Sequence, residues 1–209
     1  LPLKAGDKLV CMLPMAHMYG LAFEFLYEFS VGCHIYYLTR MPSPKIIFQA
    51  FADVKPNLIV AVPLIIEKII KKSVLPKLET PTMKLLLKVP IINDKIKATV
   101  REQMIQAFGG NFAAVIVGGA AFNQEVEQFL KMIDFPYTVG YGMTECGPII
   151  CYEDWRRFKP GSCGKAVPRM DVKVLSSDPE NIVGEIVCKG PNVMLGYYKN
   201  EEATQEVID

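Results

Sequence analysis

Residues 139–148 read VGYGMTECGP. The stretch follows an apolar run over 135–139, which predicts the end of a buried strand. Gly140 and Gly142 then let the backbone lie against a ligand at points where a Cβ atom would intrude. The chain therefore leaves a strand here and turns with its backbone accessible, and the segments on either side are arranged around that turn.

Three side chains in this stretch carry the chemistry of a nucleotide site. Tyr141 can stack on a base, Thr144 can donate a hydrogen bond to a phosphate oxygen, and Glu145 can hold a hard cation such as Mg²⁺. The same residues also fit a glycine-rich turn whose Thr and Glu simply face solvent. The stretch alone leaves both interpretations open, so the flanking chain has to decide between them.

The composition excludes several classes of protein. The 209 residues are 51% hydrophobic, which is typical of a folded chain that can bury a core. With 23 Lys and Arg against 22 Asp and Glu, the formal charge is +1, so we expect no nucleic-acid partner.

The six cysteines form no CxxC pair and there are two histidines, so we expect reduced thiols in the cytoplasm, without a zinc site or a disulfide framework. Charges break every apolar run well before 18 residues, so we expect no transmembrane helix.

Strand-like and helix-like patterns alternate along the first two thirds of the chain. The strand-like runs cover residues 8–14, 34–38, 57–62, 111–117 and 137–141, and the helical patterns cover 18–31, 44–53, 63–88, 93–108 and 123–132. This alternation predicts an α/β fold with a parallel sheet and crossover helices. We expect Pro76 and Pro81 to interrupt the third helix and Asn93 to cap the fourth.

Two of these helices have apolar faces. In residues 18–31, Phe23, Leu26 and Tyr27 fall at core spacing. Residues 63–88 combine isoleucines with several lysines, a pattern that fits a buried helix with a solvated face or a helix on a membrane surface. We favour the buried helix, and peripheral contact with a membrane stays open.

After Ile150 the helical periodicity disappears. Short strands over 171–175 and 184–188, separated by Pro and Gly turns, predict part of a small antiparallel β subdomain. We place the boundary so that 1–155 is part of an α/β domain and 156–209 is part of the β subdomain. Because the chain starts at a Leu and ends within a helical pattern, we expect it to be a piece of a longer protein.

The α/β topology predicts where a ligand lies. Parallel strands end at one edge of the sheet, which would bring together residues 14–17, Pro63, 118–121 and 140–145. His17, at a strand-to-helix turn, can point into a cleft there, although a histidine beside apolar residues is commonly structural. The small residues at 118–121 allow a planar ring or an alkyl chain to lie on the backbone, and a simple packing role is the alternative.

Four stretches, in order, resemble the adenylate-forming enzymes, and among them the branch of fatty-acyl-CoA synthetases. They are LPMAHMYG at 13–20, VGGAA at 117–121, GYGMTE at 140–145, and GEIV at 184–187 with GPNVMLGYY at 190–198. They span nearly the whole chain. The resemblance implies a fatty-acid–CoA ligase that uses ATP, Mg²⁺ and coenzyme A. In that reaction a carboxylate attacks the α-phosphate of ATP, and the thiol of coenzyme A then takes the acyl group from the adenylate.

The resemblance also implies roles for individual residues. Thr144 and Glu145 would be catalytic, with Thr144 binding the α-phosphate and Glu145 ligating Mg²⁺. The implied nucleotide-binding residues are Gly119, Ala120, Ala121, Gly140, Tyr141, Gly142, Met143 and Thr144. The implied acyl-binding residues are His17, Tyr19, Gly118 and Gly119. Tyr141 would stack on adenine, and the Gly-Ala segment would separate the adenine pocket from the acyl pocket.

The chain departs from the family pattern in two respects. Cys146 stands where the family commonly has Thr, and with no adjacent His we expect no catalytic thiol. Residues 1–209 contain no match to the family's loop that grips the β- and γ-phosphates, its ribose-binding Asp or its C-terminal domain with the catalytic Lys. We therefore expect the chain alone to be inactive.

Other functions remain alternatives. Another acyl-adenylate-forming enzyme would share the four stretches, and a non-catalytic nucleotide-binding module could keep the fold. A dinucleotide-binding motif GxGxxG fails, because its third glycine would fall on Glu145. The sequence does not predict an oligomeric state.

Overall fold

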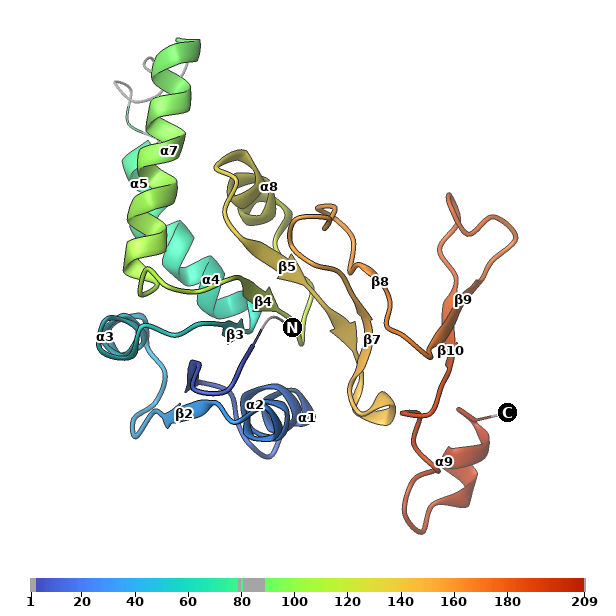
Figure 1. The fold of residues 1–209 in the computed structure, drawn as a ribbon. Helices are drawn as coiled ribbons and strands as arrows, with labels where there is room; N and C mark the ends of the chain where they lie inside the picture. The colour runs from blue at the N-terminus through green and yellow to red at the C-terminus, as the bar shows by residue number, and fades with distance from the viewer. Residues whose placement is uncertain (1–2, 79, 81–88, 209) are drawn as a thin grey trace.

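The first two thirds of the chain consist of parallel strands joined by helices (Figure 1). The structure is a computed structural model and describes residues 3–78, 80 and 89–208. Strand β1 (Lys8–Cys11) pairs with β2 (His34–Tyr37), and β3 (Ile59–Ala61), β4 (Val115–Val117) and β5 (Tyr137–Val139) pair in that order. All of these pairs are parallel, so the predicted α/β fold is confirmed.

Asn57 joins the two parallel sheets. Its backbone N donates to Lys8 O at 2.7 Å, and its Oδ1 accepts from Lys8 N at 2.8 Å. The side-chain oxygen of Asn57 thus takes the place of a backbone carbonyl in the hydrogen bonding between this segment and β1. The two sheets therefore act as sections of one twisted parallel layer.

Alternate residues of the central strands face opposite sides of that layer. On one face, Ile59, Val115 and Tyr137 lie in register and belong to the larger core cluster. On the other, Val60 and Ile116 lie side by side in a second cluster. Strands buried on both faces are typical of parallel sheets and explain why their sequences are continuously apolar.

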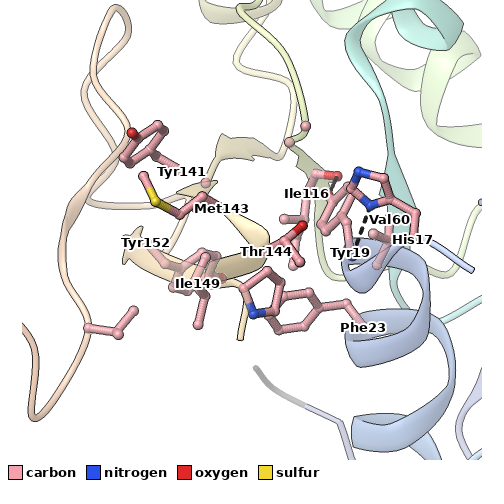
Figure 2. Close-up of a pocket in the computed structure, with 16 residues that line it drawn as sticks. His17, Tyr19, Phe23, Val60, Ile116, Tyr141, Met143, Thr144, Ile149 and Tyr152 are labelled. Atoms are coloured by element: carbon pink, nitrogen blue, oxygen red, sulfur yellow. Dashed lines mark hydrogen bonds between the residues drawn. The ribbon is translucent and has the colours of Figure 1, made fainter. Parts of the chain in front are cut away.

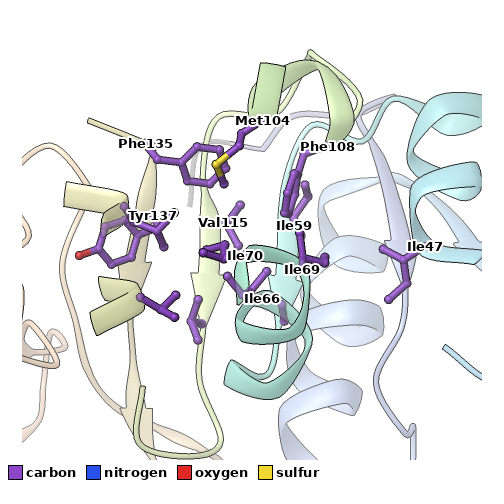
Figure 3. Packing of buried hydrophobic residues seen from close by; sticks show 14 of the residues in the cluster. Ile47, Ile59, Ile66, Ile69, Ile70, Met104, Phe108, Val115, Phe135 and Tyr137 are labelled. Atoms are coloured by element: carbon purple, nitrogen blue, oxygen red, sulfur yellow. The ribbon is translucent and has the colours of Figure 1, made fainter. Parts of the chain in front are cut away.

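Helices cover the larger cluster. They are α3 (Pro44–Val54), α4 (Pro63–Ile69), α7 (Pro90–Ala107) and α8 (Gln124–Met132). Figure 3 shows the side chains of Ile66, Ile69 and Phe108 packed against the strands from this side. The second face is covered by the helical segment 18–31, whose Tyr19 and Phe23 pack on the second cluster.

The helical segment 18–31 contains a π-helical turn that changes the buried face. It runs through α1 (Met18–Leu21), the π-helical η1 (Ala22–Leu26) and α2 (Tyr27–Val31). Because a π-helical turn holds one extra residue, the face toward β1 carries Glu24 and Glu28, which are 1% and 0% exposed. The prediction that Leu26 lies in the core is wrong, since 51% of it is exposed.

The carboxylate of Glu24 organises the end of β1. It accepts hydrogen bonds from Met12 N at 3.0 Å and Leu13 N at 2.7 Å. Burial raises the pKa of Glu24 to about 7, although these two bonds oppose the shift. Burial also raises the pKa of Glu28 to about 7, and no hydrogen-bond partner of its carboxylate oxygens is found in the described part of the chain.

Two helix boundaries differ from the prediction. The helix that begins with α4 continues through the π-helical η2 (Ile70–Val74) and α5 (Leu75–Leu78), so Pro76 does not interrupt it. The wider π turn relieves the clash that a proline ring makes with the preceding turn. Asn93 is not a cap, because α7 begins at Pro90, and proline is favoured in the first helical turn. Pro81 lies outside the described residues.

Antiparallel pairing follows β5, and its later part, over 171–189, was predicted. Strands β6 (Tyr141–Gly142), β7 (Ile149–Tyr152) and β8 (Lys165–Ala166) form one sheet, while β9 (Asp171–Leu175) and β10 (Glu185–Lys189) form a hairpin that leads to α9 (Glu201–Gln205). The first of these sheets was not predicted, and its β7–β8 pair spans the proposed boundary at 155/156. That boundary stays a prediction. Within the described ranges, no helix is long and apolar enough to span a bilayer.

Glu28→Gln should stabilise the protein at high pH. The folded-state pKa of Glu28 lies above its ordinary value of 4.5, so the folded state holds a proton that the unfolded state releases, and stability falls as pH rises from about 4.5 through 7. We expect the substitution to raise the free energy of unfolding by about 1–3 kcal/mol at pH 8 and to change it little at pH 4.5. Urea denaturation at both pH values measures this. The exposed Glu125→Gln is the matched control, and equal effects of the two substitutions at pH 8 would refute the account.

Candidate functional site

A pocket opens where the parallel strands end, with about 840 Å³ of empty space including its mouth (Figure 2). Its lining residues come from β3, β4 and the turns after β4 and β5, from the helical segment 18–31 with its N-cap, and from the antiparallel sheet with its connecting turns. They are His17, Tyr19, Phe23, Val60, Ile116, Gly118, Gly119, Gly140, Tyr141, Gly142, Met143, Thr144, Pro148, Ile149, Tyr152 and Val167. Three of the four segments predicted to converge therefore meet here, and Pro63 lies outside the lining.

Tyr19 covers the carboxyl ends of β3 and β4 on one side of the pocket. Its hydroxyl donates to Ile116 O at 3.2 Å and lies 3.5 Å from Ala61 O. Burial raises the pKa of Tyr19, so the hydroxyl stays a protonated donor. Its ring rests on Gly118, where an added Cβ would come within 3.1 Å of the ring. Packing on Tyr19 thus favours a glycine at 118, and the acyl contact implied for Gly118 stays a prediction.

His17 has a structural role at the mouth of the pocket. It is the N-cap of α1, and its Nδ1 accepts a hydrogen bond from Tyr19 N at 3.1 Å, the dashed contact in Figure 2. Because Nδ1 is the acceptor, the proton of the neutral ring is on Nε2. The ring is exposed and also lines the pocket, so the capping role and a substrate contact are compatible.

The two glycines of the central stretch differ in their packing. A Cβ on Gly142 would overlap the backbone carbonyl of Pro148, where Met143 N also donates to Pro148 O at 2.8 Å. A Cβ on Gly140 would make only an ordinary contact, 3.4 Å from Ile149 Cδ1. Gly142 is thus required by the hairpin between β6 and β7, whereas Gly140 is free to serve a ligand.

The turn after β6 directs neighbouring side chains to different places. In the 3₁₀ turn η3 (Thr144–Cys146), Thr144 is exposed and lines the pocket. Glu145 lies outside the lining, and its Oε1 accepts a hydrogen bond from Tyr197 Oη at 2.8 Å. This hydrogen bond lowers the pKa of Glu145 and favours the ionised carboxylate.

The structure brings most of the predicted site residues together, with three exceptions. The pocket includes His17, Tyr19, Gly118, Gly119, Gly140, Tyr141, Gly142, Met143 and Thr144. Ala120, Ala121 and Glu145 lie outside its lining, and both alanines are exposed. The roles assigned to all twelve residues stay predictions.

Several lining residues were missed by the sequence reasoning. Val60 and Ile116 form an apolar floor, and their place on the second face of the sheet follows from strand alternation once the register is known. The residues contributed by the antiparallel β6–β7–β8 sheet are Pro148, Ile149, Tyr152 and Val167. These had no usable signal, because strands of two to four residues leave no clear periodicity.

A clamp segment, residues 190–197, holds η3 from outside the pocket. Asn192 Nδ2 donates to Cys146 O at 2.6 Å and to Ile149 O at 3.0 Å. Met194 N donates to Glu145 O at 2.7 Å. Together with the bond from Tyr197, these contacts fix the backbone and the carboxylate of the turn.

Cys146 is inert in this setting. Its Sγ lies 3.5 Å from Cys188 Sγ, and both thiols are free. Burial raises the pKa of Cys146 to about 12, so the thiolate needed for nucleophilic attack is disfavoured. That this thiol has no catalytic role stays a prediction.

Glu145 could give one ligand to a magnesium ion, and its carboxylate lies outside the pocket lining. Among the described residues, no group of three or more His, Cys, Asp or Glu side chains could hold a metal ion. Glu145 offers one ionised carboxylate, and Mg²⁺ is commonly held by one or two carboxylates together with substrate phosphates.

Gly142→Ala should destabilise the protein, because the new methyl group overlaps a backbone carbonyl that cannot rotate away. We expect a loss of about 2–3 kcal/mol in the free energy of unfolding. Gly140→Ala is the matched control and should cost under about 1 kcal/mol. Urea denaturation of both variants decides the point, and equal stability of the two would mean that the hairpin geometry is wrong.

Comparisons with known proteins find relatives that match nearly the whole chain. The profile described as "AMP-binding enzyme" matches residues 1–198. Probable 4-coumarate–CoA ligase 2 of Dictyostelium discoideum is 31% identical over 214 residues, which cover 99% of this chain and 33% of the relative. Long-chain-fatty-acid–CoA ligase 1 of Saccharomyces cerevisiae is 25% identical over 224 residues, which cover 97% of this chain and 32% of the relative. The chain thus spans about a third of the length of these relatives.

A solved structure shares the fold. O-succinylbenzoate coenzyme A synthetase from Bacillus subtilis, in complex with ATP and magnesium ion, matches with a TM-score of 0.71 and 19% sequence identity. The match covers 100% of this chain and 38% of that one.

Proposed function

The chain belongs to the AMP-binding enzyme family, and we propose that it is the central part of an ATP-dependent acid–thiol ligase. In the proposed reaction a carboxylate oxygen attacks the α-phosphorus of ATP and pyrophosphate leaves. The thiol of coenzyme A then attacks the acyl carbon of the adenylate, and AMP leaves. The observation that carries this proposal is the placing of Tyr141 and Thr144 in one pocket at the carboxyl ends of the parallel strands.

The nucleotide is proposed to lie along the 140–144 side of the pocket. Tyr141 is half-buried there, and burial raises the pKa of its hydroxyl, so a neutral ring is offered to the adenine base. Gly140 lines the pocket and has no Cβ, so its backbone allows close approach. The exposed hydroxyl of Thr144 then donates to the α-phosphate, where negative charge accumulates as the carboxylate attacks.

Glu145 is proposed to hold the magnesium ion that accompanies ATP. Both reactants are anions, so positioning and charge neutralisation carry most of the catalysis, and a bound Mg²⁺ would neutralise phosphate charge. Glu145 suits this role because it is ionised and adjoins Thr144.

The acyl group is proposed to lie on the apolar floor. Val60, Ile116, Phe23 and Tyr19 give that side of the pocket almost no charge, which suits a carboxylate with an apolar body. We propose a fatty acid, in line with the name of the yeast relative. An aromatic acid is the second candidate, because the relative with 31% identity is named for 4-coumarate. Initial rates of pyrophosphate release by the longest natural form of the protein, with hexadecanoate and with 4-coumarate, separate the two.

The remaining parts of the proposal concern the cellular setting. Free thiols and the absence of a helix able to span a bilayer, in the part of the chain described, are compatible with a cytoplasmic enzyme. Peripheral contact with a membrane is retained for the lysine-bearing helix that begins at α4. A non-catalytic module with the same fold would bind the nucleotide without releasing pyrophosphate even in the longest natural form of the protein.

Thr144→Ala tests the proposed phosphate contact. Loss of a hydrogen bond to a charged phosphate should weaken binding of a non-hydrolysable acyl-adenylate analogue by about 10–100-fold, measured by calorimetry. Thr99→Ala is the matched control, since Thr99 is an exposed residue of α7 whose hydroxyl donates within its own helix, to Lys95 O. Unchanged affinity in the Thr144 variant would remove the central support for the proposal.

A further inference from the structure

Tyr197 reaches across the fold to the side chain of Glu145. The two residues are 52 positions apart, yet Tyr197 Oη donates to Glu145 Oε1 at 2.8 Å. The backbone of Glu145 is held by the same segment, since Met194 N donates to Glu145 O at 2.7 Å. Glu145 is therefore fixed through both its main chain and its carboxylate.

Tyr197 is itself held in place from its other side. Its backbone N donates to Thr204 Oγ1 at 2.9 Å, and its backbone O accepts from Asn200 N at 3.1 Å. Gly196 has a φ of +146°, and a Cβ there would come within 2.9 Å of Thr204 Cγ2. The turn into α9 thus presents the phenol at a defined position.

We propose that Tyr197 is a positioning residue for the divalent cation, because its hydroxyl binds Oε1 of Glu145 and so fixes the orientation of the carboxylate. This inference rests on the proposed function, in which Glu145 holds Mg²⁺ with ATP. A carboxylate on an exposed turn would otherwise rotate among several rotamers. A hydrogen bond to one oxygen orients a metal-binding carboxylate while leaving the other oxygen available, and partners of this kind commonly contribute 10–100-fold to metal affinity.

The adjacent tyrosine offers a matched comparison. Tyr198 is 88% exposed, and its ring faces Lys199 Nζ at 5.2 Å, whereas Tyr197 is 37% exposed and contacts Glu145. Tyr197→Phe and Tyr198→Phe remove the same atom from neighbouring positions. If Tyr197 acts through Glu145, Tyr197→Phe should weaken metal binding and Tyr198→Phe should not.

The test uses Mn²⁺ in place of Mg²⁺ in the longest natural form of the protein. Electron paramagnetic resonance measures free Mn²⁺ during titration in the presence of ATP, and calorimetry measures ATP binding in EDTA. We expect Tyr197→Phe to weaken Mn²⁺ binding about 10–100-fold, with metal-free ATP binding and the urea midpoint unchanged. Tyr198→Phe should behave as wild type.

Three outcomes would overturn the inference. Wild-type Mn²⁺ affinity in Tyr197→Phe would show that the phenol does not position the carboxylate. Parallel loss of metal binding, metal-free ATP binding and stability would show that Tyr197 only anchors the clamp segment. Failure of the wild-type protein to bind Mn²⁺ with ATP would also refute the proposed function, which the first two outcomes leave intact.

Discussion

The last hydrogen bonds of the parallel ladder fix the geometry on which the pocket depends. Gly118 N donates to Ala61 O at 3.1 Å, and Gly140 N donates to Val117 O at 2.9 Å. These bonds end β4 and β5 at the same level, so the two glycine-containing turns emerge side by side. Tyr19 then donates to the carbonyl of Ile116 and packs on Gly118, over the ends of β3 and β4.

The pocket joins two kinds of surface. The strand face supplies an apolar floor at Val60 and Ile116, and the turn after β6 supplies the hydroxyl of Thr144. The clamp segment (190–197) holds that turn from the antiparallel part of the chain, through Asn192 and Tyr197. An anionic head group and an apolar body can therefore be bound by different elements whose relative positions are fixed by hydrogen bonds.

Local sequence patterns predicted much of this arrangement but not all of it. The strands could be predicted because β-branched residues run continuously through β4, and the convergence of their ends follows from parallel pairing. Leu26 was misplaced because a π-helical turn shifts the buried face, and composition does not reveal such a turn. Asn93 was misread as a cap because Pro90 starts the helix one turn earlier.

The orientation of the Glu145 side chain could not be predicted from local sequence patterns either. The resemblance identified the residue, but its side chain is directed by Tyr197, and no local pattern contains a contact that spans 52 positions. The exposed positions of Ala120 and Ala121 are likewise set by how the turn after β4 lies in the whole fold. Such positions depend on contacts between residues that lie far apart in the sequence, and hydrophobic periodicity contains no information on those contacts.

The most direct measurement of the central claim is a crystal structure of the protein with a non-hydrolysable acyl-adenylate analogue. The account predicts electron density for the adenine ring beside Tyr141 and for the phosphate within hydrogen-bond distance of Thr144, with the acyl group over Val60 and Ile116. Density for the analogue at any other surface, with this pocket empty, would contradict it.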